Sequence, residues 1–477
     1  MIAAMSAEIT YLFRHALLRD AAYELQLPSD RAALHAVALG ILEAAYGGPP
    51  PGPVRDKWGE STCRQLPIDS LAAELALHAR AARQTAANPD QYFRAREILY
   101  LRRAAEYCER SFQCAEAVSS WQALGAQLAG REKAQALHRA GVQANLSGRA
   151  THAESLLSQA LESAQRGTDQ RVEGRVLAAM ANVYRETGRV EQAQQAHEQA
   201  VAIYRKVGDR RSEGAVLGNL AIAYRESGCV AQAERTYEQA LAIQREAGDR
   251  RSEGVTLGNL ANVYQNTGRF EQAEQAHERA IAIHREVGDR RSEGAVLGNL
   301  AIVYQYTGRF EQAERTHTQA LAIHREVGNR RTEGMTLGNL AIVCQATGRD
   351  EQAERAFEQA LAIHREVGNR RFEGITLGSL AGLYGQTGRI EQAGQTYERA
   401  IAIQREVGDR HSEGLTLCDY ALCLLAQRRH EPARGRWREG TALLQVLKDT
   451  AELERRRIDM RDVCAKAGVP PFDEAAP

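Results

Sequence analysis

The chain has 477 residues, of which 44% are hydrophobic, 6% aromatic and 26% charged. This composition favours an all-α protein and argues against a β-sandwich or a disordered chain. Lysine and arginine together number 61, as do aspartate and glutamate, so no general electrostatic attraction for nucleic acid or an anionic membrane is expected.

The cysteines and the N-terminus indicate a reducing compartment. The eight cysteines form no C-x-x-C pair and have no neighbouring Cys or His at metal-ligand spacing, so we expect small buried apolar groups. Residues 1–10 contain Glu8 and lack the cationic start and apolar run of a signal peptide, and no stretch of about 18 apolar residues occurs. We expect a soluble, cytoplasmic protein that neither binds metal nor enters a membrane.

The N-terminal region is expected to be a separate piece. Residues 1–46 should form a small helical segment, and residues 47–60, which begin Gly-Gly-Pro-Pro-Pro-Gly-Pro, should form a linker. The strings Phe13-Arg-His-Ala-Leu17 and Asp20-Ala-Ala-Tyr23 resemble the end of the ATPase module in bacterial signalling ATPases of the STAND type. In that family this part follows a nucleotide-binding module and precedes repeats. The alternative is an ordinary amphipathic helix pair, because short apolar patterns recur by chance.

The rest of the chain is dominated by internal repeats. The string Gly-Asp-Arg-Arg-Ser-Glu-Gly begins at positions 208, 248 and 288 and returns in modified form at 328, 368 and 408, a period of 40. We expect degenerate helical repeats over residues 61–130, regular repeats over 131–447, and a capping helix with a tail over 448–477. The tail should be frayed from Val469 onward.

Each unit carries the pattern of two amphipathic helices. Leu297, Leu300, Ala301 and Tyr304 have the i, i+3, i+4, i+7 spacing of a core face, and their helix should end at Gly308 in a left-handed conformation. A second helix from about residue 310 should bury Ala313, His317, Ala320 and Ile323. The N-cap of the following helix is expected at Asp209, Asp249, Asp289, Asn329, Asn369 and Asp409.

These positions resemble the tetratricopeptide repeat. The 40-residue units, with their Leu-Gly-Asn-Leu-Ala core, look like those of Pins-type spindle-orientation adaptors and, more loosely, kinesin light chains. The resemblance implies an all-α, right-handed solenoid of stacked antiparallel helix pairs, a tetratricopeptide superhelix, that binds peptides in its concave groove. A family unit usually has about 34 residues and a closing Pro; here Arg325 stands in that place and the junction is longer.

No catalytic motif accompanies the repeats. None of the five lysines follows a glycine, which excludes a Walker A loop, so any ATPase module must lie outside this chain. The motifs G-x-G-x-x-G, G-x-S-x-G and H-E-x-x-H are also missing. His277 and His284 are separated by about 10.5 Å of helical rise, too far to share one metal ion. The interleaved charges of residues 281–320 are interpreted as a solvated, salt-bridged surface. We expect no enzyme activity, cofactor or metal.

The remaining candidate is the groove. In the fold that the chain resembles, the first helix of each pair lines the concave side. The residues expected to bind a peptide there are Asn219, Asn259, Asn299, Asn339, Arg225, Asn262, Gln265, Gln305, Tyr306 and Gln345. An Asn amide is both donor and acceptor and suits an extended peptide backbone, while the glycine before it allows close approach. The alternative is that these asparagines bond neighbouring helices. Because residues 214–222 and 294–302 are identical, their repetition is not independent evidence.

Three functional classes are therefore distinguished. The leading hypothesis is a non-enzymatic scaffold or sensor that binds peptide segments of protein partners in bacterial signalling. The alternative is a regulatory fragment of a split STAND-type ATPase or cyclase system whose nucleotide-binding part is on another chain. RNA binding by helical repeats would require a basic groove, which the neutral composition does not favour.

Overall fold

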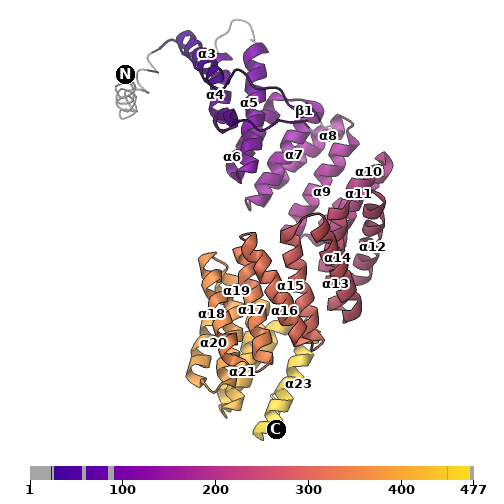
Figure 1. Cartoon of the computed structure of the whole chain (residues 1–477), viewed down its shortest axis with the longest axis vertical. Coiled ribbons are helices and arrows are strands. Elements are labelled where there is room, and N and C mark those ends of the chain that lie inside the picture. Colours follow the sequence, from indigo (N-terminus) through magenta and orange to yellow (C-terminus); the bar gives the residue numbers. More distant parts are fainter. Residues whose placement is uncertain (1–22, 24–25, 56–60, 84–90, 448, 473–477) are drawn as a thin grey trace. The chain divides into compact units, whose positions relative to one another are not determined.

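The computed structural model describes residues 23, 26–55, 61–83, 91–447 and 449–472, which form 21 α-helices in consecutive antiparallel pairs (Figure 1). The chain divides into two units, residues 1–243 and 244–477. The architecture is the all-α solenoid of stacked helix pairs that the sequence predicts.

Unit 1 begins with helices that share one core. Its first elements are α3 (Pro28–Ala45), β1 (Val54–Arg55), β2 (Ser61–Thr62), the 3-10 helix η1 (Pro67–Leu71), α4 (Ala72–Arg83), α5 (Gln91–Arg110) and α6 (Cys114–Gln127). Leu39 of α3 lies in one cluster with Ile68 and Tyr100, whose hydroxyl donates to Oε1 of Glu43 at 2.6 Å. Residues 47–55 of the expected linker thus join elements of a common core. The string from Phe13 to Leu17 lies outside the described residues.

The repeat helices follow without interruption. Unit 1 continues with α7 (Gly130–Leu146), α8 (Ala150–Arg166), α9 (Gln170–Glu186), α10 (Val190–Val207), α11 (Arg210–Glu226) and α12 (Val230–Glu246), whose last residues belong to unit 2. Unit 2 contains α13 (Arg250–Asn266), α14 (Phe270–Glu286), α15 (Arg290–Tyr306), α16 (Phe310–Glu326), α17 (Arg330–Ala346), α18 (Asp350–Glu366), α19 (Arg370–Gln386), α20 (Ile390–Glu406), α21 (Arg410–Ala426), α22 (His430–Val446) and α23 (Thr450–Ala467).

The helix boundaries follow the predicted turn chemistry. Gly308 and Gly328 adopt φ values of +72° and +66°, the left-handed conformation that closes each helix. Asp289 caps the next helix by accepting the Ser292 N–H at 3.1 Å. Asn369 is an exception, because its side chain makes no cap hydrogen bond. The predicted core faces are confirmed in the same way: Leu297, Leu300, Ala301, Tyr304, Ala313, His317, Ala320 and Ile323 are all buried.

A close approach between paired helices explains the glycine that ends the repeated string. A Cβ atom on Gly294 would lie 2.8 Å from Cε1 of His324 and 3.0 Å from Cγ2 of Ile323. Gly254 meets His284, and Gly334 meets His364, in the same way. The second helix therefore packs so closely against the first that only glycine fits without a shift of the neighbours.

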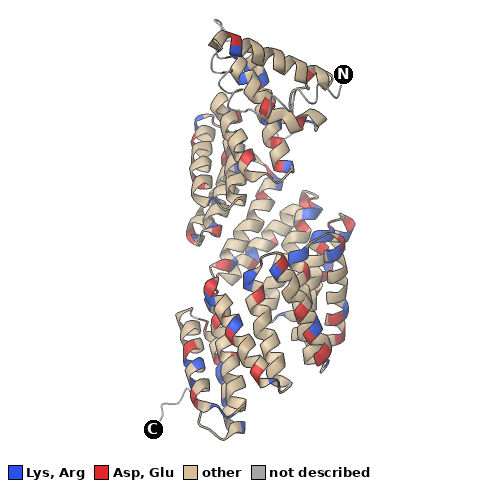
Figure 2. Cartoon of the chain, turned by 90° about the vertical axis from the view of Figure 1, so that its left-hand side faces the viewer, with Lys and Arg blue, Asp and Glu red and all other residues tan. Residues whose placement is uncertain are grey.

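A buried carboxylate ties each pair to the preceding one. Glu293 is 1% exposed and accepts hydrogen bonds from Nε of Arg285, at 2.6 Å, and from Nη1 of Arg290. The same junction clamp is formed at Glu213, Glu253, Glu333, Glu373 and Glu413. The predicted salt bridges are therefore present, but the expected solvation is wrong for this glutamate, because two guanidinium groups replace its hydration. Elsewhere charges of both signs are interspersed along the helices (Figure 2).

The turn between α21 and α22 lacks its glycine. Arg428 stands where the preceding unit has Gly388 and adopts a φ of +59°. Because a Cβ atom in the left-handed region costs about 1–2 kcal/mol, we expect Arg428→Gly to raise the melting temperature by about 2–4 °C in thermal melts followed by circular dichroism. Gly388→Arg should lower it. Equal melting temperatures for the wild type and both variants would contradict this account of strain.

Unit 2 closes with the predicted capping helix. α23 packs on α21 and α22, and the three helices contribute to one core cluster. The expectation of a frayed tail is wrong for residues 469–472: Phe472 is 8% exposed, its N–H contacts Sδ of Met460 at 3.2 Å, and Val469 packs on the same cluster. The apolar side chains of Val469 and Phe472 complete the end of the core, which holds the chain in place. Residues 473–477 lie outside the described part.

Candidate functional site

The asparagines predicted to form a groove lie on the first helices of successive pairs, α11, α13, α15 and α17. The side chains of Asn219, Asn259, Asn299 and Asn339 are half-buried, and their amides make no hydrogen bond to the residues that the structure describes. None of these amide atoms is buried. The amides are therefore open to solvent and able to bond a ligand.

The other predicted residues divide between packing and exposure. Nε2 of Gln305 donates to the carbonyl oxygen of Asn339 at 3.1 Å, and Nε2 of Gln345 donates to Oε1 of Gln386 at 2.8 Å, so both bond the next helix pair. Tyr306 is 63% exposed and stacks on Phe270, with ring centroids 5.8 Å apart. The remaining three, Arg225, Asn262 and Gln265, are half-buried, and Oε1 of Gln265 has no partner among the described residues.

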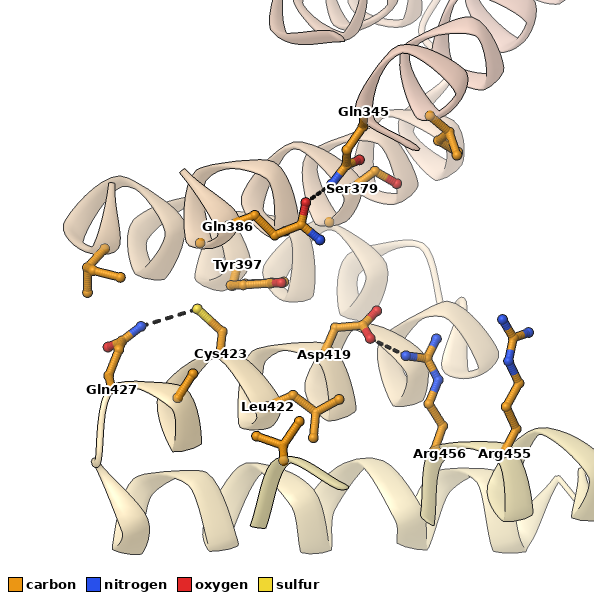
Figure 3. A pocket seen from close by; sticks show the side chains of 17 residues that line it. Gln345, Ser379, Gln386, Tyr397, Asp419, Leu422, Cys423, Gln427, Arg455 and Arg456 are labelled. Carbon is orange, nitrogen blue, oxygen red and sulfur yellow. Dashed lines mark hydrogen bonds and ion pairs between the residues drawn. The ribbon is translucent and has the colours of Figure 1, made fainter. Parts of the chain in front are cut away.

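A cavity of about 900 Å³ lies in unit 2, between α17, α19 and α21 on one side and α23 on the other (Figure 3). Residues of α17, α19 and α21, which are first helices of their pairs, line it, and the sequence predicts that these helices line the groove. Of the ten predicted site residues, Gln345 lines this cavity, next to Ile342 of the same helix. The structure thus locates a hollow near the C-terminal end of the repeats.

Glycines of α19 form one wall of the cavity. Gly378, Gly382 and Gly385 place no side chain in front of the helix backbone, and a Cβ atom on Gly382 would meet only the Tyr397 hydroxyl, at 3.5 Å. A ligand can therefore approach the α19 backbone closely. Apolar surface is supplied by Ile342, Ile390, Leu422 and Val463.

The opposite wall carries charge. Arg455 and Arg456 extend from α23 into the cavity (Figure 3). Arg456 pairs with Asp419 of α21 and, through Nε, with Glu452 at 2.9 Å. The side chain of Arg455 is 68% exposed and lies 3.8 Å from Glu452. The cavity therefore combines apolar contact with amides and a solvent-accessible guanidinium group.

The cavity contains no activated nucleophile. Burial raises the pKa of the Cys423 thiol above its usual value, which disfavours the reactive thiolate. Burial, and then the charge of Asp419, also raises the pKa of the Tyr397 hydroxyl. Among the described residues no group of three His, Cys, Asp or Glu side chains is placed to hold a metal ion.

Most of the cavity was missed by sequence reasoning. Continuing the 40-residue register from Asn339 reaches Ser379 and then Asp419, both of which line it. The Asn pattern ends before these positions, so it gave no reason to include them. Arg455 and Arg456 lie outside the repeat, and no sequence signal places them at the groove.

Stacked helix pairs with a hollow on their first helices define a helical-repeat binding protein. The tetratricopeptide repeat family model matches residues 132–206, 212–286, 292–366 and 372–445, more than half of the chain, and the chain belongs to this family. Among curated proteins none matches the sequence. Within the described residues, no helix has the length and apolar character needed to cross a membrane.

Several solved structures are similar to this chain. The apo form of the quorum sensor NprR from B. thuringiensis is 14% identical with a TM-score of 0.52, covering 79% of this chain and 98% of that one. A STAND protein with a tetratricopeptide repeat sensor from Pyrococcus horikoshii is 17% identical with a TM-score of 0.52, covering 72% of this chain and 55% of that one, so this chain spans little more than half its length. A putative kinesin light chain from Podosopora anserina is 28% identical over 40% of this chain and 95% of that one, with a TM-score of 0.36.

Proposed function

We propose that this chain is a non-enzymatic scaffold or sensor that binds an extended peptide segment of a protein partner in the cavity of unit 2. The cavity, of about 900 Å³, is the observation that carries the proposal. Its glycine wall admits a peptide backbone, its apolar residues accept side chains, and the amides of Gln345, Gln386 and Gln427 supply donors and acceptors.

The open amides of Asn259, Asn299 and Asn339 extend the proposed surface along the first helices of unit 2, and Asn219 supplies an equivalent contact in unit 1. A mid-helix Asn is a poor helix former, so a ligand contact accounts for its presence at these positions. We place the protein in the bacterial cytoplasm, in signalling. The quorum sensor and the STAND sensor share its fold, and its eight cysteines are all free thiols.

Peptide selection tests the cavity. Random peptides displayed on phage are selected on the immobilised full chain, and the affinity of the enriched peptides is measured by calorimetry. Gly382→Leu places a side chain in the cavity without a Cβ clash, and we expect it to weaken binding by about tenfold or more while the melting temperature is retained. Gly435→Leu is the matched control. Gly435 is a helical glycine of α22 with no atom within 4 Å of a Cβ position and lies outside the cavity, so affinity should not change.

The asparagines give a second measurement on the same peptides. Asn299→Ala with Asn339→Ala removes two ligand hydrogen bonds, each worth about 0.5–1.5 kcal/mol, and improves helix propensity. Affinity should fall by about tenfold while the melting temperature holds or rises. A lower melting temperature with unchanged affinity would assign these residues to packing. The proposal itself is refuted if selection enriches no peptide, or if Gly382→Leu binds the enriched peptides as the wild type does.

A second candidate function is the regulatory part of a split STAND-type ATPase or cyclase system. The observation that favours it is an apolar stripe on α3, where Leu34, Val37 and Ile41 are each more than half exposed and share one helical face. If this stripe docks the ATPase chain, a protein with a Walker A motif should co-purify with the wild type and with Gly382→Leu. It should be lost with Val37→Glu. Retention by Val37→Glu would eliminate this candidate.

A further inference from the structure

A second cavity lies in unit 1. It has a volume of about 230 Å³ and is lined by Arg102 of α5, Arg139 of α7 and Arg175 of α9, together with Trp121 and His138. Among the described residues, no carboxylate belongs to its lining. Three guanidinium groups from three helices therefore surround one small space.

Among the described residues Arg102 has no direct ion-pair partner, although the buried carboxylate of Glu106 on the same helix interacts with it electrostatically. Arg102 is 7% exposed, and its Nη1 donates to the carbonyl oxygen of Ser61 at 3.2 Å. No carboxylate of the described residues lies within 4.0 Å of it. The neighbouring Arg103, fully buried, instead pairs with Asp69 at 2.8 Å. A buried guanidinium group without a direct ion pair is poorly compensated, so the site around Arg102 favours a further anion.

The rest of the cavity wall is held rigidly. The guanidinium group of Arg139 lies 4.2 Å from the centroid of the Trp121 ring and also bonds Glu109, which accepts the indole N–H of Trp121 at 2.7 Å. His138 makes no hydrogen bond to the described part of the chain. Burial, followed by the charges of Arg175 and Arg139, lowers its pKa to about 3. The neutral imidazole leaves one N–H able to donate to a ligand.

We propose that this cavity binds a compact tetrahedral oxyanion, either inorganic phosphate or the phosphate group of a small molecule. Arg102, which has no direct ion pair with the described residues, supplies positive charge together with Arg175 and with Arg139, which also pairs with Glu106 and Glu109. Planar guanidinium groups bond phosphate oxygens in pairs, which suits three of them around one space. The small volume restricts the ligand to the phosphate group with little attached to it.

Calorimetry on the full chain tests the proposal. Phosphate, glycerol phosphate and pyrophosphate are titrated separately in phosphate-free buffer, with sodium chloride as the control for ionic strength. We expect saturable binding of phosphate or of glycerol phosphate, and the comparison shows whether the ligand is the free ion or an ester. Arg102→Gln should weaken binding by at least about tenfold. Arg166→Gln, which removes a guanidinium group from an Arg side chain that is 77% exposed, should leave binding unchanged.

Thermal melts distinguish a built site from a general salt effect. Without phosphate, the melting temperatures of the wild type and of Arg102→Gln give the baseline for each protein. With phosphate, the wild type should gain stability and the variant should not. If Arg102→Gln fails to fold, Arg175→Gln is used to compare the phosphate-dependent change in melting temperature. The proposal is overturned if no phosphate compound binds saturably, or if phosphate shifts the melting of wild type and variants equally.

Discussion

We expect the double variant His277→Phe with His317→Phe to be more stable than the wild type at pH 5. The difference in unfolding free energy between the two proteins should be about 4 kcal/mol larger at pH 5 than at pH 8, or about 2 kcal/mol per histidine. Both imidazoles are fully buried, their ring nitrogens have no partner among the described residues, and burial lowers each pKa to about 4. In the unfolded chain the histidine pKa values are near 6.5, so these histidines bind protons at pH values where the buried imidazoles of the folded chain stay neutral. Stability is therefore lost as the pH falls from about 6.5 to about 4.

Aromatic residues already occupy the equivalent position in other units of this chain. Phe357 and Tyr397 occupy the same position in later units and are buried there. Thermal melts by circular dichroism between pH 5 and pH 8 provide the measurement, with His152→Gln as the control for loss of a histidine that is not buried. A double variant that follows the wild-type pH profile would show that the two imidazoles accept protons in the folded state.

The second large effect concerns two glycines four residues apart in α15. Gly294→Ala should destabilise the protein by about 1–3 kcal/mol, although alanine is the better helix former, because its Cβ atom would be forced against His324 and Ile323. Gly298→Ala should stabilise it by about 0.5–1 kcal/mol, because no atom lies within 4 Å of its Cβ position. Urea unfolding of both variants gives the comparison.

A compensating change separates steric clash from other causes. His324→Ala removes the ring that Gly294→Ala would meet, so the double variant should be less destabilised than the sum of the two single variants. If the losses of unfolding free energy in the two single variants simply add in the double variant, contact with the His324 ring is not the cause of the destabilisation. If Gly294→Ala proved as stable as Gly298→Ala, the close approach of α15 and α16 would not explain the repeated glycine.

The features that sequence predicted well are local and periodic. The apolar stripe of Leu297 and Leu300, the left-handed Gly308 and the capping Asp289 each depend on residues a few positions apart, and 40-residue repetition shows the same pattern several times. The prediction of an all-α solenoid with paired helices is therefore confirmed.

The features that sequence could not supply depend on contacts between units. The sequence does not distinguish Glu293 from an exposed glutamate, because the burial of Glu293 depends on two arginines that the fold brings together. Likewise Gly294 and Gly298 look equivalent in the sequence, and only the position of α16 distinguishes them. The candidate cavity depends on α23, which has no repeat pattern, so most of the cavity lining could not be predicted.

The junction clamp at Glu293 has a consequence for how the number of repeat units can change. Its two arginines come from the end of one unit, Arg285, and the start of the next, Arg290, and the same pairing recurs at Glu333 and Glu373. Any unit end therefore matches any unit start. Recombination between the near-identical repeats can add or remove whole units without leaving a buried carboxylate unmatched, so the number of units is free to vary while each junction stays chemically the same.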